Sequence, residues 1–243
     1  MALHDVILSL RDICYSYDRW GLVLDHLNFD LHRGQRVGLV GDNGSGKTTL
    51  LHLIVGLKRP EAGRIEVFGR PVASEEDFRQ VRQRVGLLFQ DADDQLFCPT
   101  VLEDVAFGPI NQGKHPEEAR EIALRVLADL GLAGFEERIT HRLSGGEKRL
   151  VSLATVLAMA PDVLLLDEPT TGLDHDTKER LVEILQGLAI SSVVVSHEYD
   201  FLGRTAELVY YMQAGRLLAE EASAIHSHYH VHSFGKLPHQ HSS

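Results

Sequence analysis

The segment from Gly41 to Thr48, with the sequence GDNGSGKT, constrains the fold of this chain more than any other stretch. It matches the pattern G-x-x-x-x-G-K-[ST], follows an apolar run at residues 37–40 and precedes an apolar segment at 50–57 that we expect to be helical. Glycines allow such a loop to curl with its backbone N–H groups pointing inward, which creates a concave anion site at the start of a helix. A glycine-rich turn with a chance lysine is the alternative, but it does not explain all four fixed positions in this setting. The segment therefore predicts that the chain binds a nucleoside triphosphate.

The side chains of this loop predict how the nucleotide is held. A lysine at the position of Lys47 reaches the β- and γ-phosphates, and the hydroxyl of Thr48 is placed to ligate Mg²⁺. The residues that we expect to bind the nucleotide here are Gly41, Asn43, Gly44, Ser45, Gly46, Lys47, Thr48 and Thr49.

The composition narrows the class of protein. A chain of 243 residues fits one large α/β domain, or one with a small subdomain. The net charge of −11 argues against a nucleic-acid-binding surface, which needs clustered Lys and Arg. The longest apolar runs, such as 163–166 and 193–195, are too short to span a bilayer. Cys14 and Cys98 lie far apart, form no metal-ligand pair and are expected to be buried thiols.

The order of predicted elements suggests a core with an insertion. Apolar periodicity and turn residues predict short strands within 6–33, broken at 18–21 and 33–34. The further predicted elements are strands at 64–69, 85–89, 163–166 and 191–196 and helices at 75–84, 101–107, 117–131 and 147–160. We therefore predict a nucleotide-binding domain over residues 1–222, with a helical subdomain at about 91–161, followed by a flexible His-rich tail at 223–243.

Polar residues follow three of the predicted strands. Gln90 ends the strand at 85–89, Asp167 and Glu168 end the buried run at 163–166, and His197 follows the strand at 191–196. In α/β sheets, ligands bind at the carboxyl ends of the strands, where these residues would meet the phosphate loop. Taken singly, the carboxylates could be a solvated strand end and His197 a satisfied core histidine. Their order along the chain decides between these interpretations.

Six elements occur in a fixed order: the phosphate loop, Gln90, LSGGE at 143–147, LDEP at 166–169, TGLD at 171–174 and His197. Together they resemble the ATP-binding-cassette (ABC) ATPases over roughly residues 6–220. The resemblance implies an α/β fold, with a P-loop NTPase core, an N-terminal antiparallel β subdomain and an inserted helical subdomain. It also implies hydrolysis of ATP, with ATP and Mg²⁺ as the cofactors.

The resemblance assigns roles to the polar strand ends. Asp167 would hold Mg²⁺, usually through water, and Thr48 and Gln90 would also contact the metal. Glu168 would be the general base that polarises the attacking water, and Gln90 would assist catalysis. His197 would contact the γ-phosphate and keep the water and Glu168 in register.

Two tyrosines precede the phosphate loop, and one of them falls where the family stacks adenine. Tyr17 is the expected choice and Tyr15 the less favoured one. Spacing alone leaves open the alternative that either ring simply packs on a sheet.

The resemblance also implies a dimer. In this family the residues at Ser144, Gly145 and Gly146 bind the γ-phosphate of ATP held by the other subunit, and Asp174 belongs to a loop that crosses to it. The chain has one cassette, so a homodimer or a heterodimer with a second ABC ATPase is expected. Glu147 departs from the glutamine that is commoner at the end of this motif.

The stretches FQDADDQLF at 89–97 and EDVAFGP at 103–109 resemble the ATPases of energy-coupling-factor importers. In that group the region meets the coupling helices of an integral membrane protein, which carry arginines, and the importer includes a substrate-binding membrane component. We hypothesise that Asp91, Asp93, Asp94 or Glu103 faces those arginines; the alternative is a merely solvated acidic loop. The expected location is peripheral, at the cytoplasmic face of the cell membrane.

Residues 143–158 look most similar to the cobalt and nickel branch of these importers. His226, His228, His230 and His232 alternate in the tail, so an extended chain would place four imidazoles on one face, suited to Ni²⁺, Co²⁺ or Zn²⁺. A polar tail that binds metal only incidentally is an equal alternative. The function alternatives are a vitamin importer with the same ATPase role, a soluble ABC ATPase without a transport role, and a metal-binding regulator.

Overall fold

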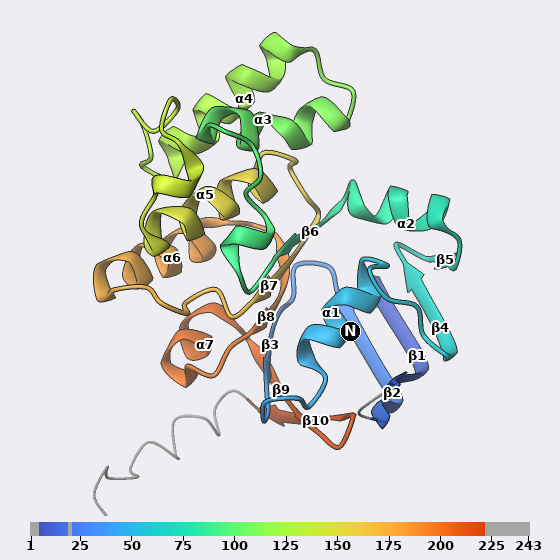
Figure 1. Cartoon of the computed structure of the whole chain (residues 1–243). Helices are drawn as coiled ribbons and strands as arrows, with labels where there is room; N and C mark the ends of the chain where they lie inside the picture. Colours follow the sequence, from blue (N-terminus) through green and yellow to red (C-terminus); the bar gives the residue numbers. More distant parts are fainter. Residues whose placement is uncertain (1–4, 19–20, 222–243) are drawn as a thin grey trace, which may run out of the picture.

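The computed structural model describes residues 5–18 and 21–221 and contains two sheets (Figure 1). The first is antiparallel, with the order β2-β1-β4-β5. Its strands are β1 (Val6–Tyr17), β2 (Gly21–His32), β4 (Ala62–Val67) and β5 (Arg70–Val72). The second has the order β10-β9-β3-β8-β7-β6 and is parallel except for the edge pair β9–β10. Its strands are β3 (Arg36–Val40), β6 (Val85–Leu88), β7 (Val163–Asp167), β8 (Ser191–Val195), β9 (Leu208–Gln213) and β10 (Arg216–Glu221).

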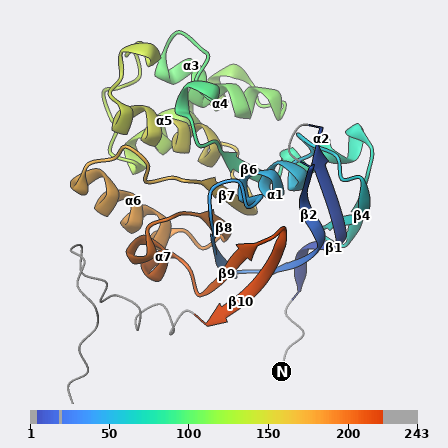
Figure 2. The same ribbon diagram turned by 60° about the horizontal axis from the view of Figure 1, so that its bottom comes forward.

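Helices cover the second sheet and form a separate group at one end. They are α1 (Lys47–Ile54), α2 (Glu75–Arg82), α3 (Val101–Asn111), α4 (Pro116–Asp129), α5 (Gly145–Leu157), α6 (His175–Gly187) and α7 (Tyr199–Thr205), with 3₁₀ turns η1 (Ala92–Asp94) and η2 (Thr140–Arg142). Figures 1 and 2 both show α3, α4 and α5 together, away from β1, β2 and β4. The predicted α/β class, with an antiparallel β subdomain and an inserted helical region, is confirmed.

The central strand β7 explains why the sheet is covered on both faces. All five of its residues are buried. Val163 and Leu165 belong to the cluster that includes α1, whereas Leu164 and Leu166 belong to the cluster that includes α5. Side chains alternate across a strand, so a continuous apolar run supplies both cores at once.

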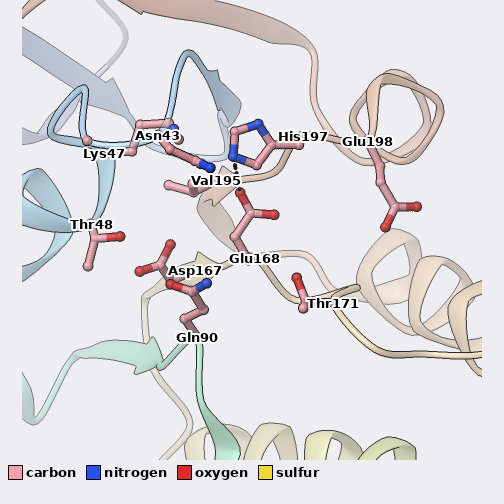
Figure 3. Close-up of a pocket in the computed structure, with 11 residues that line it drawn as sticks. Asn43, Lys47, Thr48, Gln90, Asp167, Glu168, Thr171, Val195, His197 and Glu198 are labelled. Carbon is pink, nitrogen blue, oxygen red and sulfur yellow. Dashed lines mark ion pairs between the residues drawn. The ribbon is translucent and has the colours of Figure 1, made fainter.

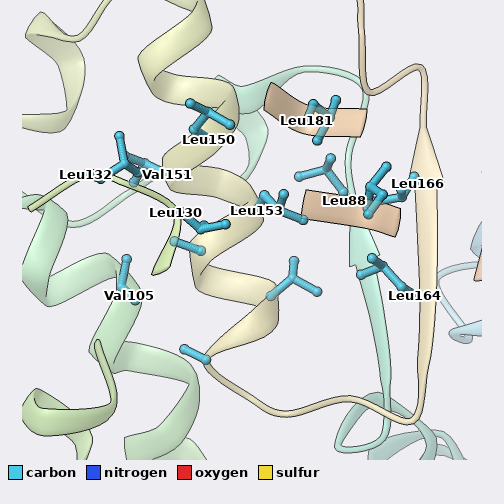
Figure 4. Packing of buried hydrophobic residues seen from close by; sticks show 14 of the residues in the cluster. Leu88, Val105, Leu130, Leu132, Leu150, Val151, Leu153, Leu164, Leu166 and Leu181 are labelled. Atoms are coloured by element: carbon cyan, nitrogen blue, oxygen red, sulfur yellow. The ribbon is translucent and has the colours of Figure 1, made fainter. Parts of the chain in front are cut away.

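The helical group is attached to the sheet through α5. Leu150, Val151 and Leu153 of α5 are buried in the cluster that also holds Leu164 and Leu166 of β7 (Figure 4). The start of α3 is fixed by a capping box: the Thr100 hydroxyl accepts from the Glu103 N–H, and the Glu103 carboxylate accepts from the Thr100 N–H at 3.0 Å. This capped start agrees with the helix predicted from residue 100 onward.

Two details of the sequence interpretation were wrong. The short strands expected within 6–33 are two strands of twelve residues each. Asp12 and His26 have positive φ values of 56° and 50°, and the register of β1 against β2 shifts near them. Such bulges interrupt the alternation of apolar residues, which made long strands look short. Cys14 and Cys98 are only half-buried rather than buried thiols.

Within the described residues, no helix has both the length and the apolar character needed to cross a membrane. The predicted His-rich tail at 223–243, with His226, His228, His230 and His232, lies outside them.

Candidate functional site

A cavity of about 390 Å³ lies at the carboxyl edge of the parallel strands, beside the start of α1 (Figure 3). It brings together most of the polar residues that the sequence singled out. The residues that line it are Asn43, Gly44, Lys47, Thr48, Gln90, Asp167, Glu168, Thr171, Val195, His197 and Glu198. The loop between β3 and α1 forms one wall, and the ends of β7 and β8 form the other.

The loop itself depends on glycines in conformations that other residues rarely adopt. Gly41, Gly44 and Gly46 have φ values of 144°, 79° and 108°. A Cβ at Gly41 would lie 2.4 Å from the carbonyl oxygen of Met212 in β9, and one at Gly46 would lie 2.7 Å from Leu24 Cδ2. The loop is therefore packed from behind by β9 and β2, and Gly46 leads directly into the N-terminus of α1.

Lys47 is the buried cation of the cavity. The residue is only 6% exposed, and Nζ donates to the carbonyl oxygens of Gly41 at 2.7 Å and Asp42 at 3.0 Å. Burial lowers the pKa of Lys47, while the carboxylates of Glu168 and Asp167 oppose that shift. An ammonium group at a helix N-terminus next to inward N–H groups attracts an anion such as a phosphate. Ser45 and Thr49 are placed by the same turn but do not line the cavity.

The oxygen atoms in the cavity fit Mg²⁺. Asp167 is buried at the end of β7, and its Oδ1 atom has no hydrogen-bond partner. Burial raises the pKa of Asp167, and the hydroxyl of Thr48 and the charge of Lys47 oppose that shift. Thr48 and Gln90 add a hydroxyl and an amide to the same space. Mg²⁺ prefers oxygen ligands, with one or two carboxylates completed by phosphates and water, so these residues would suit it.

Glu168 and His197 are the two ionisable side chains that meet in the cavity. His197 Nε2 lies 3.2 Å from Glu168 Oε1, and the two side chains point towards each other in Figure 3. Burial raises the pKa of Glu168, and the neighbouring His197 opposes that shift. Glu168 also has a positive φ of 47°, which is rare for a non-glycine residue. A carboxylate of raised pKa in a phosphate-binding cavity suits a general base.

Three residues of the cavity were not foreseen as site residues: Thr171, Val195 and Glu198. Lys178 Nζ donates to both carboxylate oxygens of Glu198 at 2.8 Å. Although burial opposes it, hydrogen bonds from Lys178 and Thr170 lower the pKa of Glu198. The only signals in the sequence were that Glu198 directly follows His197 and that Thr171 begins TGLD.

Ser144, Gly145, Gly146 and Asp174 do not line the cavity. Ser144 caps α5, and Asp174 caps α6 by accepting from the Thr177 N–H at 2.9 Å. A Cβ built on Gly146 would lie 3.5 Å from Thr177 Oγ1, so the two predicted partner-facing segments are neighbours. They form a second polar region, separate from the cavity, and its action across a dimer stays a prediction.

Tyr17 also lies outside the lining of the cavity. Its hydroxyl is 3.2 Å from Thr49 Oγ1, its ring meets that of Tyr15 edge-on at 5.0 Å, and the Lys58 ammonium lies 4.7 Å from the ring centroid. Tyr15 packs partly against the core. Stacking of adenine on Tyr17 stays a prediction.

The sequence and the fold were compared with known proteins. A model of the ABC transporter family matches residues 24–171. A putative ABC transporter ATP-binding protein of Nitratidesulfovibrio vulgaris is 48% identical over 98% of this chain and 87% of its own length. The energy-coupling factor transporter ATP-binding protein EcfA of Methanothermobacter thermautotrophicus is 42% identical over 88% of this chain and 70% of its own length.

Solved structures are similar over nearly the whole fold. The structure of cbiO1 from Clostridium perfringens, described as part of the ABC transporter complex cbiONQ, has a TM-score of 0.81 and 33% identity and covers 92% of both chains. A dimeric ATP-binding cassette in a post-hydrolysis state, bound to ADP and Pi, has a TM-score of 0.82 and 26% identity over 89% of this chain and 99% of its own.

Proposed function

This chain belongs to the ABC transporter family and hydrolyses ATP, and we propose that it is the ATPase subunit of an energy-coupling-factor importer for a transition metal, cobalt or nickel. It would act at the cytoplasmic face of the membrane, bound to an integral coupling protein and a substrate-binding membrane component. The similarity to EcfA and to cbiO1 supports the type of importer.

In the proposed mechanism, the polar residues of the cavity have distinct roles in binding and hydrolysing ATP. Lys47 and the loop N–H groups hold the phosphates, and Glu168 accepts a proton from the attacking water. His197, 3.2 Å from Glu168, keeps that carboxylate turned towards the γ-phosphate. Thr48, Gln90 and Asp167 would hold Mg²⁺, which when bound would offset the negative charge of the phosphates.

We also propose that the second polar region serves the nucleotide of a partner subunit. Ser144 begins α5 at the surface, where its hydroxyl donates to the Glu147 carboxylate at 2.9 Å. A partner's phosphate would bind at the same helix N-terminus, next to the N–H groups of Gly145 and Gly146. Gly145 has open space around it, as a surface that receives a phosphate requires. A homodimer or a heterodimer would satisfy this arrangement equally.

An exposed apolar groove supports the proposal that the chain binds an integral membrane protein. It has a volume of about 390 Å³ and includes Phe89, the residue before Gln90. Phe97 and Phe107 are 65% and 44% exposed and meet edge-on at 4.8 Å, and Leu57 at the same groove is 51% exposed. Large exposed apolar side chains gathered in one groove mark an interaction site, and a helix of the membrane protein is the proposed occupant.

The contacts of the four acidic candidates next to this groove distinguish them. Asp91 accepts from the Asp93 N–H at 2.9 Å, Asp93 pairs with Lys148, and Glu103 caps α3. Within the described part of the chain, Asp94 takes part in no such side-chain bond, and it is exposed. We therefore expect Asp94 to be the acid that is free to meet an arginine of the membrane protein.

Charge reversal tests this assignment. Asp94→Lys should abolish most ATP-dependent uptake in cells, because it opposes a cationic partner, and leave the basal ATPase rate of the purified protein unchanged. Glu121→Lys, an exposed acid on α4, is the matched control and should keep uptake normal. Normal uptake in the Asp94 variant would contradict the docking assignment.

The cargo is tested separately, by pull-down from native membranes and metal analysis of cells that lack this protein. Small membrane proteins that co-purify, together with lowered cellular cobalt or nickel, would support the metal importer. Membrane partners with normal metal content would indicate a vitamin importer instead. Without any membrane partner, the importer proposal fails and a soluble ATPase or a metal-binding regulator takes its place.

A further inference from the structure

Arg149 connects α5 to the carboxyl ends of two neighbouring strands, β6 and β7, without lining the cavity. Its side chain is buried, with 3% exposure, and lies in the first half of the helix that Ser144 caps. The guanidinium donates to four backbone carbonyls: those of Phe89, Asp167 at 3.4 Å, Glu168, and Pro169 at 3.1 Å. One of these carbonyls belongs to Phe89, the residue before Gln90, and another belongs to Glu168 itself.

A buried arginine usually has a carboxylate partner, but Arg149 forms none of the ion pairs present in the described residues. Burial lowers the pKa of Arg149, while Asp167, Asp91 and Glu168 oppose the shift from a distance. A guanidinium remains charged in proteins, and its planar fork of five N–H donors can bridge several carbonyls at once. Arg149 therefore fixes the positions of backbone carbonyls and does not neutralise a carboxylate partner.

The backbone at Glu168 requires such support. Its φ of 47° is in the left-handed region, which is unfavourable for a residue with a Cβ. Its N–H donates to the Val195 carbonyl at 3.0 Å, and its carbonyl accepts from Arg149, so both peptide groups are held. In this conformation Glu168 Oε1 lies 3.2 Å from His197 Nε2. Without the Arg149 bond, the peptide could relax and turn the carboxylate away.

We propose that Arg149 is a positioning residue that holds Glu168 in its left-handed conformation and thereby aims the carboxylate at the attacking water. This inference rests on the proposed role of Glu168 as the general base. Because Arg149 and Ser144 share α5, a movement of that helix would be transmitted to the backbone of Glu168. A shift in the helical group would then alter the geometry of the base through one side chain.

The test compares substitutions of two arginines that both donate to backbone carbonyls. Arg149→Lys and Arg149→Met are measured for kcat, for the KM for ATP and for thermal stability, next to Arg180→Met. Arg180 donates to the Leu130 carbonyl, neither residue lines the cavity, and Arg180 therefore serves as the control for a purely structural loss. Arg149→Lys keeps a cation that can donate to some of the same carbonyls, so it remains informative where Arg149→Met does not fold.

The expected result is a fall in kcat of about tenfold to a hundredfold for Arg149→Met with a nearly unchanged KM, because the base is misplaced and the phosphate site is intact. Arg149→Lys should recover part of that loss, and Arg180→Met should lower thermal stability with a normal kcat. A normal kcat in folded Arg149→Lys and Arg149→Met would overturn the inference. A Glu168→Gln variant with the kcat of the wild-type protein would instead overturn the assignment of Glu168 as the base.

Discussion

The chain begins two helices with glycine-rich segments, and they are built differently. At α1, glycines with positive φ pack against β2 and β9, and a buried lysine closes the loop. At α5, Gly145 has open space around it, and a capping box between Ser144 and Glu147 holds the turn. The first segment is shaped by its own fold, whereas the second presents an open surface. The loop at α1 is thus shaped by contacts within its own chain, whereas the open start of α5 is the region for which we propose a partner's phosphate.

The largest effect is expected for a substitution that removes the proposed general base from the cavity beside α1 and leaves the start of α5 unchanged. Glu168→Gln should lower kcat by about 10²–10⁴-fold and leave ATP binding intact, because a general base acts on water and not on nucleotide affinity. Phosphate release at saturating ATP and binding of a fluorescent nucleotide measure the two quantities. ATP should also hold this variant as a dimer in gel filtration. Hydrolysis within tenfold of wild type would show that the base lies elsewhere.

A matched pair of glycine substitutions addresses the shape of the two segments. Gly46→Ala should lower the free energy of unfolding by about 1–3 kcal/mol and weaken ATP binding, because φ is 108° and the new Cβ would lie 2.7 Å from Leu24 Cδ2. Gly145→Ala should change the unfolding free energy by less than about 0.5 kcal/mol and keep ATP binding, but lower hydrolysis.

Urea unfolding, nucleotide titration and phosphate release separate the effects of the two glycine variants. Equal losses of ATP binding in both variants would contradict our proposal that the loop at α1 binds the chain's own ATP and the start of α5 binds the partner's ATP.

The smallest expected effect concerns the cap at α5. Hydrogen bonds from the Ser144 N–H and hydroxyl lower the pKa of Glu147, and Arg138 adds to this. A lowered folded-state pKa stabilises the fold above the ordinary glutamate value of about 4.3, and this stability is lost as the pH falls through the lowered value. Glu147→Gln should thus lower the unfolding free energy by about 0.5 kcal/mol at pH 7 and by nothing once Glu147 is protonated.

Unfolding in urea at neutral and at acidic pH would measure this difference for Glu147→Gln, with Glu121→Gln as the control. A constant difference at both pH values would show that the charge of Glu147 plays no part in the cap.

Much of the fold could be predicted because its signals are local. The phosphate loop, the buried run at β7 and the cap at Thr100 depend on neighbours in the sequence, and each was found where it was expected. The long strands β1 and β2 were missed because bulges at Asp12 and His26 break their alternation.

The site was less predictable where its partners are distant or lack a side-chain signature. Asp93 stays a predicted contact of a membrane partner, and its pairing with Lys148, 55 residues away, could not be foreseen from local sequence. Arg149 gave no signal at all, because its partners are carbonyls, which every residue carries. Pairings between an arginine and the backbone cannot be read from residue types.

The support of the phosphate loop by β9 has a consequence for synthesis of the protein. The strand that leads into the loop, β3, has β8 and β9 as its sheet neighbours, and Gly41 packs on the carbonyl of Met212. A ribosome that adds about 5–20 residues per second therefore releases β9 roughly ten to thirty seconds after the loop has been made. During that interval the nascent chain carries the complete phosphate loop, and β2 behind it, without β8 and β9. The phosphate loop is among the first segments to be translated, but its support is among the last to be assembled.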